Sequence, residues 1–257
     1  MTPRPIICFV HIPKTAGSTV NHLLAKHLPN GQAQAHALIE NSEALPKRIK
    51  KMDWLSAHLP YSRFRSAVMA ATDRPRHIYS LLRTPSAQVM SHYNWLIEIF
   101  HRGSGFYEGH PQHIKKISQA IRNADNSDPR QVIGLLRTHS GLFLNTQARF
   151  VLPNAFKNAE GDDLIKALRR YRGIHVQDQL PALMKQMLEK DIDAEKRINS
   201  AIYHFDTAVF DTPEIREFLS RENALDERVY AQVAEGLPPR GRAARAAGVK
   251  RATLADS

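Results

Sequence analysis

The chain has 257 residues, of which 42% are hydrophobic and 24% charged, a balance that fits a soluble globular protein with one substantial core. It has no apolar run of about 20 residues, no signal-peptide pattern and only one cysteine, Cys8, so we expect no membrane span, no disulfide and a cytoplasmic location. The net charge is +11, and part of it lies in the Arg-rich residues 240–257, so we predict a single domain over residues 1–239 followed by a basic, disordered tail.

Short apolar runs and helical patterns alternate along the chain. The run "PIICFVHI" at residues 5–12 predicts a fully buried strand, and residues 18–28 follow with apolar side chains on one helical face. The same criteria predict further elements in chain order: strands at 53–59 and 76–83, a helix from Pro85 to about Phe100, a strand and then a helix within 173–190, and two short helices within 213–235.

This alternation predicts an α/β fold with a central parallel sheet flanked by helices on both faces. Ligands of such sheets bind at the carboxyl ends of the strands. Residues from about 101 to 140 are polar and helical in pattern, and they are predicted to form a helical insertion. That insertion is either a lid or acceptor-binding region or a plain helical excursion.

The first motif, "HIPKTAGST", joins the first strand to the first helix. Unpaired N–H groups at a helix start attract anions, and Gly17 permits close approach of the backbone. Ser18 and Thr19 add hydroxyl donors, and Lys14 adds a positive charge. The motif differs from a Walker A loop because Lys14 precedes the glycine. The segment predicts an anion-binding loop.

The second motif, "LLRTPSAQVMSHYNWL", starts at a strand end. Thr84 suits the N-cap position and Pro85 the first helical turn, so a helix is expected to begin there. Ser91 lies about two turns further on, which returns it to the same helix face as the cap. Arg83 and Ser91 are therefore placed to hold one phosphate together.

Together the two motifs resemble the sulfotransferases that use 3′-phosphoadenosine 5′-phosphosulfate (PAPS), in particular the carbohydrate branch that includes the heparan and uronyl 2-O-sulfotransferases. Weaker likeness runs through "NTQARF" and "RENALDERVY". The resemblance implies a P-loop NTPase-like fold and transfer of a sulfuryl group to an acceptor hydroxyl, most readily on a carbohydrate, with 3′-phosphoadenosine 5′-phosphate (PAP) as product. The donor-binding residues that it implies are Lys14, Thr15, Ala16, Gly17, Ser18, Thr19, Arg83 and Ser91. The chain departs from the family pattern at Thr84, where Asp is usual, and at Gln88, where Arg is frequent, and the second departure removes a cation.

The resemblance also implies the catalytic groups. Lys14 would stabilise the leaving phosphate, and His58, in "LSAHLPYSRF", resembles the family's catalytic histidine and would act as the base. His92 is the alternative base, and His11 is expected to shape the loop. The residues Tyr61, Arg63 and Arg65 either line the acceptor side or occupy a helix surface.

Other functions stay open on sequence alone. A nucleotide or small-molecule kinase would use a similar loop but needs a Walker lysine and a magnesium-binding acid, and neither is evident. A non-enzymatic nucleic-acid or anion binder would use the net charge, although the densest basic run has no aromatic residues. The pair His110 and His113 lacks a third ligand, so we expect no metal. A peptide, lipid or small-metabolite acceptor remains an alternative to carbohydrate, and the sequence does not define the oligomeric state.

Overall fold

The structure is a computed structural model that describes residues 4–156, 158–191 and 202–237, so the predicted tail at 240–257 lies outside the described residues. Its centre is one five-stranded, fully parallel sheet in the order β2-β3-β1-β4-β5. The strands are β1 (Ile6–Val10), β2 (Gly31–Gln32), β3 (Trp54–Ala57), β4 (Arg76–Leu82) and β5 (Gly173–Val176). The α/β class with a parallel sheet, predicted from the sequence, is confirmed.

The central strand β1 is apolar throughout because helices cover both faces of the sheet. Ile6, Cys8 and Val10 belong to one core cluster, whereas Ile7 and Phe9 belong to another on the opposite face. The side chains alternate between the two faces with the period of two that a strand imposes. Both cores are therefore anchored on the same five residues.

Two helices cover the face that carries Ile7, namely α1 (Gly17–His27) and α12 (Leu180–Leu188). The opposite face packs against a larger set: α2 (His36–Glu40), α3 (Ala44–Ile49), α4 (Tyr61–Ala71), α10 (Thr146–Val151), α11 (Gly161–Leu168) and α14 (Ala224–Ala234). Short 3-10 turns lie at Asn154–Phe156, Gln177–Gln179 and Thr207–Asp211. The prediction of helices on both faces is confirmed.

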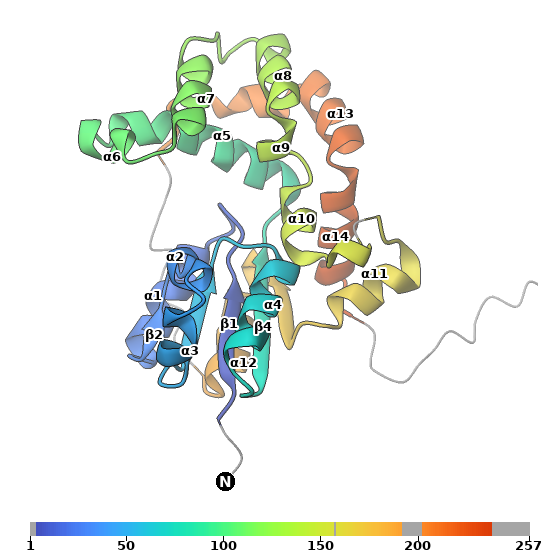
Figure 1. Ribbon diagram of the computed structural model, residues 1–257. Coiled ribbons are helices and arrows are strands. Elements are labelled where there is room, and N and C mark those ends of the chain that lie inside the picture. The colour runs from blue at the N-terminus through green and yellow to red at the C-terminus, as the bar shows by residue number, and fades with distance from the viewer. Residues whose placement is uncertain (1–3, 157, 192–201, 238–257) are drawn as a thin grey trace, which may run out of the picture.

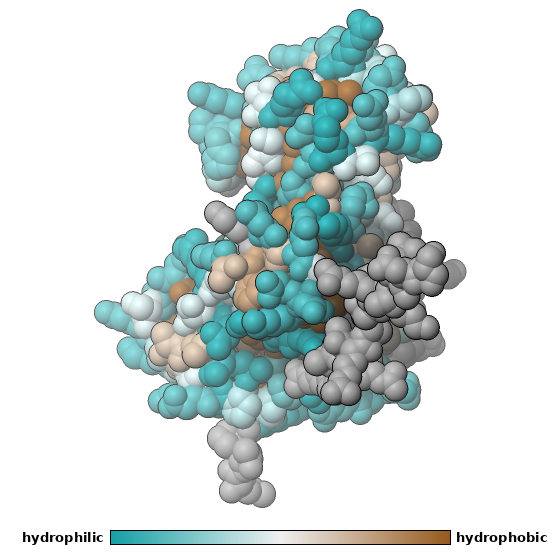
Figure 2. All heavy atoms as spheres, turned by 90° about the vertical axis from the view of Figure 1, so that its right-hand side faces the viewer, coloured by the Kyte–Doolittle hydropathy of each residue, from teal (hydrophilic) through white to brown (hydrophobic). Residues whose placement is uncertain are grey.

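The remaining helices form a lobe beyond the carboxyl ends of the strands (Figure 1). They are α5 (Pro85–His101), α6 (Ser104–Glu108), α7 (Gln112–Arg122), α8 (Pro129–Thr138), α9 (Ser140–Phe143) and α13 (Pro213–Glu222). The lobe has its own core, in which Tyr93 of α5 is fully buried. Figure 2 shows that the outline narrows to a waist between the lobe and the sheet body. No helix of the described ranges is both long and apolar enough to cross a membrane.

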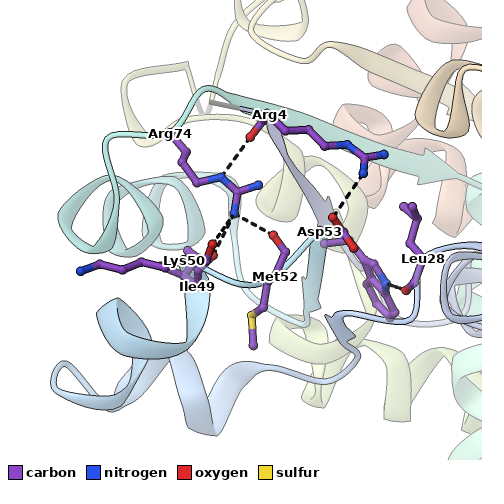
Figure 3. Close-up of polar contacts among 8 residues, drawn as sticks. Arg4, Leu28, Ile49, Lys50, Met52, Asp53 and Arg74 are labelled. Atoms are coloured by element: carbon purple, nitrogen blue, oxygen red, sulfur yellow. Dashed lines mark hydrogen bonds and ion pairs between the residues drawn. The ribbon is translucent and has the colours of Figure 1, made fainter. Parts of the chain in front are cut away.

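Arg74 ties several segments together at the amino end of the sheet (Figure 3). Its guanidinium donates to the backbone carbonyl of Arg4 at 3.0 Å, and to those of Ile49, Lys50 and Met52 at 3.0, 3.4 and 2.8 Å. The four carbonyls belong to the segment before β1 and to the end of α3 with the turn after it. A single side chain thus fixes how these segments meet.

Replacement of Arg74 by methionine is expected to lower the free energy of unfolding by about 1.5–3 kcal/mol, because charged hydrogen bonds are lost and carbonyls are left without their donor. Urea titration measures this loss. The matched control is Arg63→Met, because the exposed Arg63–Glu40 ion pair at 2.8 Å is worth at most about 1 kcal/mol. Equal losses in the two variants would show that Arg74 is an ordinary surface residue.

Candidate functional site

The strand order creates a crevice at the carboxyl end of β1. After β1 the chain forms β2 and β3, which lie on one side of β1. It then crosses to the other side, where β4 and β5 lie. Ligands of open parallel sheets bind at such a reversal of strand order. The register places Val10 opposite both Ala57 of β3 and Ser80 of β4, so the three strands end at nearly the same level. The residues that follow them are therefore brought together.

The loop between β1 and α1 has an unusual backbone. Lys14 and Ala16 both have left-handed conformations, with φ angles of 69° and 66°. Such angles are uncommon for residues with a side chain and cluster at ligand sites. Ala16 occupies the N-cap of α1, and within the described residues it gives the helix no side-chain cap. The first N–H groups of α1 are thus open to an anion.

Gly17 is required by the packing of His11 against the start of α1. A Cβ atom at Gly17 would lie 2.0 Å from Cδ2 of the His11 ring, far inside van der Waals contact. The His11 ring in turn contacts the His58 ring at a tilt of 36°, with ring centroids 4.0 Å apart. This adjacency follows from the register, because His11 follows Val10 and His58 follows Ala57. His11 thus shapes the loop, as predicted.

His58 is held in one tautomer. Its Nδ1 lies 2.7 Å from the backbone carbonyl oxygen of His11. Since a carbonyl only accepts hydrogen bonds, Nδ1 carries the proton and Nε2 keeps its lone pair. Burial lowers the pKa of His58 below its usual value, and His36 lowers it further, while the bond to His11 opposes the shift. The side chain is therefore a neutral imidazole whose Nε2 can accept a proton.

His92, the alternative base, has a different environment. Its ring is 3% exposed, and burial, with smaller contributions from Lys14 and His58, lowers its pKa to about 3. A group with so low a pKa is a weak proton acceptor at neutral pH. His92 lines the same cavity as His58, but its basicity is much less suited to taking a proton.

Arg83 lies at the end of β4, as predicted. Its Nη1 donates to the carbonyl of Lys14 at 3.4 Å, which links it to the first motif. The side-chain amide of Gln147 holds its backbone at both polar atoms: it accepts from the Arg83 N–H at 2.9 Å and donates to the Arg83 carbonyl at 2.8 Å. Ser91 lies on α5 and is 3% exposed. Gln147 belongs to the segment "NTQARF", but its contact with Arg83 was not predicted from the sequence.

The two departures from the family pattern have clear positions. Thr84 is the N-cap of α5 and Pro85 is in its first turn, but the Thr84 side chain makes no cap hydrogen bond. Gln88 is fully buried, and its Nε2 donates to the carbonyl of Pro13 at 3.1 Å. A glutamine here supports the backbone of the loop between β1 and α1 directly, because its amide donates to the carbonyl of the residue before Lys14.

A cavity of about 1350 Å³ joins these groups. It is larger than the roughly 300–1,000 Å³ of a typical site for one small molecule. The predicted residues that line it are Lys14, Ala16, Gly17, Ser18, Thr19, His58, Arg83 and Ser91. Thr15 is the exception among the predicted donor-binding residues. It is fully buried, and its hydroxyl donates to the carbonyl of Ile12 at 3.1 Å, so it stabilises the loop from within.

Four basic side chains line the cavity: Lys14, Arg83, Arg102 and Arg149. Burial lowers the pKa of Lys14, and the nearby cations Arg102 and Arg83 lower it further, while Glu98 opposes them. Burial also lowers the pKa of Arg149. Cations that are close together and partly removed from water repel one another, and a multiply charged anion placed among them stabilises them electrostatically.

The sequence-based alternatives for the acceptor side are not at the cavity. Tyr61 is buried in the core with its ring 5.0 Å from that of Tyr171, and Arg63 pairs with Glu40. Neither of them lines the cavity, and neither does Arg65. Instead, Gln34, His36 and Asn154 do so from loops and helix ends. No motif marks these three residues in the sequence, because long-range folding brings them together.

Of the two histidines considered as a metal pair, His110 lines the cavity, and its Nδ1 lies 2.8 Å from the carbonyl of Phe106. Within the described part of the chain, no three His, Cys, Asp or Glu side chains lie close enough to share a metal ion.

The segments "NTQARF" and "RENALDERVY" meet in space. The Asn145 side-chain oxygen accepts from the N–H groups of Leu225 and Asp226 at the start of α14, at 3.0 and 3.2 Å. In return, the Asp226 carboxylate accepts from the N–H groups of Gln147 and Ala148 at the start of α10, at 3.1 and 2.7 Å. Each helix thus caps the other, and the capped α10 presents Gln147 to Arg83.

Comparison of the sequence with protein-family models gives no match, and comparison with curated proteins gives none either.

Proposed function

We propose that the protein is a PAPS-dependent sulfotransferase that acts on a hydroxyl group, most readily on a carbohydrate. The observation that carries this proposal is the convergence of three separate sequence segments on one cavity: the loop at Lys14, the pair Arg83 and Ser91, and His58. Each segment follows a different strand, and the strands are neighbours in the order β3, β1, β4. A phosphate-binding loop directly after β1 in a sheet of this order supports a P-loop-like arrangement.

The donor would span the β1 and β4 sides of the crevice. Its 5′-phosphosulfate would lie on the open N–H groups of the loop and near Lys14, and its 3′-phosphate would lie between Arg83 and Ser91. Both ends of the donor are anionic, and the positive charges that line the cavity match this charge. The basic side chains of the cavity and the left-handed loop after β1 would thus bind the donor together.

In the transfer, the acceptor oxygen forms a bond to sulfur while the bond from sulfur to the 5′-phosphate oxygen breaks. The acceptor proton goes to Nε2 of His58, and the electron pair of the broken bond stays on the phosphate oxygen of the departing PAP. Lys14 stabilises the charge that develops on this leaving oxygen. By analogy with phosphoryl transfer, positioning and electrostatics supply most of the acceleration. We place the protein in the cytoplasm as part of the same proposal.

Calorimetric titration with PAP tests the donor class. We expect micromolar affinity that depends on the 3′-phosphate, with adenosine 5′-phosphate binding much more weakly. Arg83→Ala should weaken PAP binding by roughly 10–150-fold, the loss equivalent to about 1.5–3 kcal/mol for a hydrogen bond to a charged group. Because the Gln147 side chain binds the backbone of residue 83, that backbone should keep its position in the Arg83→Ala variant.

Arg63→Ala is the matched control, since Arg63 lies outside the cavity and should leave the PAP affinity unchanged. Equal affinity for PAP and adenosine 5′-phosphate would refute the assignment of Arg83 and Ser91 to a 3′-phosphate, and with it the proposed donor.

A further inference from the structure

The cavity is chemically divided. Its four cations lie on the β1 loop, at the end of β4, at the C-cap of α5 and on α10, where they surround the region assigned to the donor. The part next to β3 is lined by Gln34, His36, His58, Pro60 and Asn154. Among the described residues, this part contains amide and imidazole groups and no Lys, Arg, Asp or Glu side chain.

Hydrogen bonds and a ring contact place these residues on the β3 side. The N–H of Ala35 donates to the carbonyl of Ser56 in β3 at 2.8 Å, which fixes Gln34 and His36 beside the strand. The backbone N–H of Asn154 lies 3.2 Å from the Ser62 hydroxyl, near the start of α4. The rings of His36 and His58 have centroids 6.2 Å apart. The group is therefore adjacent to the proposed base.

A strained backbone indicates that this wall is built to meet a ligand. Gln34 has a left-handed backbone with a φ angle of 48°, a strained conformation that is frequent at binding sites.

The chemistry of the wall selects among acceptors. Amides and imidazoles offer both donors and acceptors of hydrogen bonds, as hydroxyl groups do. A carboxylate or sulfate placed here would lose its hydration and would meet no Lys or Arg side chain in return. Neutral hydroxylated molecules avoid this cost.

We propose that Gln34, His36 and Asn154 form the acceptor-binding wall, and that the acceptor is a neutral polyhydroxylated compound with no anionic group beside the reacting hydroxyl. This inference rests on the proposed sulfotransferase function. It goes beyond that function by specifying the acceptor's charge and the side of the sheet from which the acceptor enters.

The test measures sulfuryl transfer from radiolabelled PAPS to matched pairs of acceptors. Methyl 6-deoxyglucoside and methyl 6-deoxygalactoside, which have a methyl group at carbon 6, are compared with the corresponding methyl uronides, which have a carboxylate there, so the reacting hydroxyls are the same in each pair. We expect kcat/KM for the neutral glycosides to exceed that for the uronides by at least tenfold. PAP affinity is measured on the same preparations by calorimetry.

Substitutions at two positions locate the wall. Asn154→Lys adds a cation there and should shift the preference toward the uronides by at least tenfold, whereas Asn123→Lys on the exposed end of α7 should not. His36→Phe should raise the KM for the acceptor and leave the PAP affinity unchanged. His36→Gln keeps a polar side chain and should raise the acceptor KM less. His22→Phe, on the exposed face of α1, is the control and should change neither value.

The outcomes separate the two proposals. A preference for uronides, or PAP binding without transfer to any neutral glycoside, would overturn the acceptor assignment and leave the donor assignment intact. Failure to bind PAP would overturn the proposed function itself. An unchanged preference in Asn154→Lys would also overturn the placement of the acceptor on the β3 side.

Discussion

Replacement of His58 by alanine is expected to lower kcat for sulfuryl transfer by about 10²–10⁴-fold, the usual contribution of a positioned general base. The Nδ1 proton of His58 is held by the His11 carbonyl, so Nε2 is the atom left to receive the acceptor proton. Without it, the proton must go to water or to His92, whose pKa of about 3 makes it a poor substitute. Steady-state kinetics with labelled PAPS measure the loss.

The His58→Ala variant should retain PAP affinity within a few-fold, because His58 lies on the β3 side and the donor is assigned to β1 and β4. His22→Ala on the exposed face of α1 should keep full activity. Added imidazole should restore part of the lost rate in His58→Ala. A normal kcat in this variant would show that another group takes the proton, even if PAP still binds.

The pH dependence of that activity has a defined sign. Burial lowers the pKa of His58 below its usual 6.5, so the neutral, proton-accepting form persists as the solution becomes mildly acidic. The rate should therefore decline only below the ordinary histidine pKa.

The stability of the protein is expected to fall steeply in acid. His11 and His92 each have a pKa of about 3 in the folded state, mainly because of burial, against 6.5 for an ordinary histidine. Between these values the unfolded chain binds two more protons than the folded one. The free energy of unfolding should then drop by about 2.7 kcal/mol per pH unit below about pH 6.5, since each proton contributes about 1.4 kcal/mol per unit.

A few pH units of such loss equal the whole stability of a typical domain, about 5–15 kcal/mol. Urea titrations at pH 7, 6 and 5 measure the slope. His92→Gln should reduce the slope attributable to these two residues by about half, because glutamine does not titrate, whereas His22→Gln on the surface should leave it unchanged. A slope that is the same in all three proteins would contradict the buried, neutral state of His92.

The sequence predicted the elements whose own pattern is strong. β1 is continuously apolar and α1 has one apolar face, and both formed close to their expected bounds. β2 was missed because it has only two residues and depends on pairing with β3. α4 was not predicted, although its buried residues Tyr61, Phe64 and Val68 have the spacing of one helical face.

The candidate site likewise contains residues that local motifs indicated and contacts that only the fold creates. Gly17 and Arg83 line the cavity, and the sequence indicated both as candidates. Each belongs to a local motif, in which a strand, a turn and the start of a helix follow one another along the chain. The adjacency of His11 and His58 depends on which strands are neighbours and in what register, and local periodicity contains neither. Gln147 lies within "NTQARF", but its contact with Arg83 spans 64 positions, so the local pattern could not indicate that the two residues meet.

The mutual capping of α10 and α14 has a consequence for synthesis of the protein. The segments that carry Lys14, His58, Arg83 and Ser91 all lie among the first 91 of the 257 residues, so they leave the ribosome early. The carboxylate that caps α10, and so steadies Gln147 against Arg83, comes from Asp226, almost 80 residues after its partners. During translation the loop between β1 and α1 can thus form well before the backbone of Arg83 is held by Gln147. The nascent chain completes the candidate site only when α14, the last described helix, has emerged and docked.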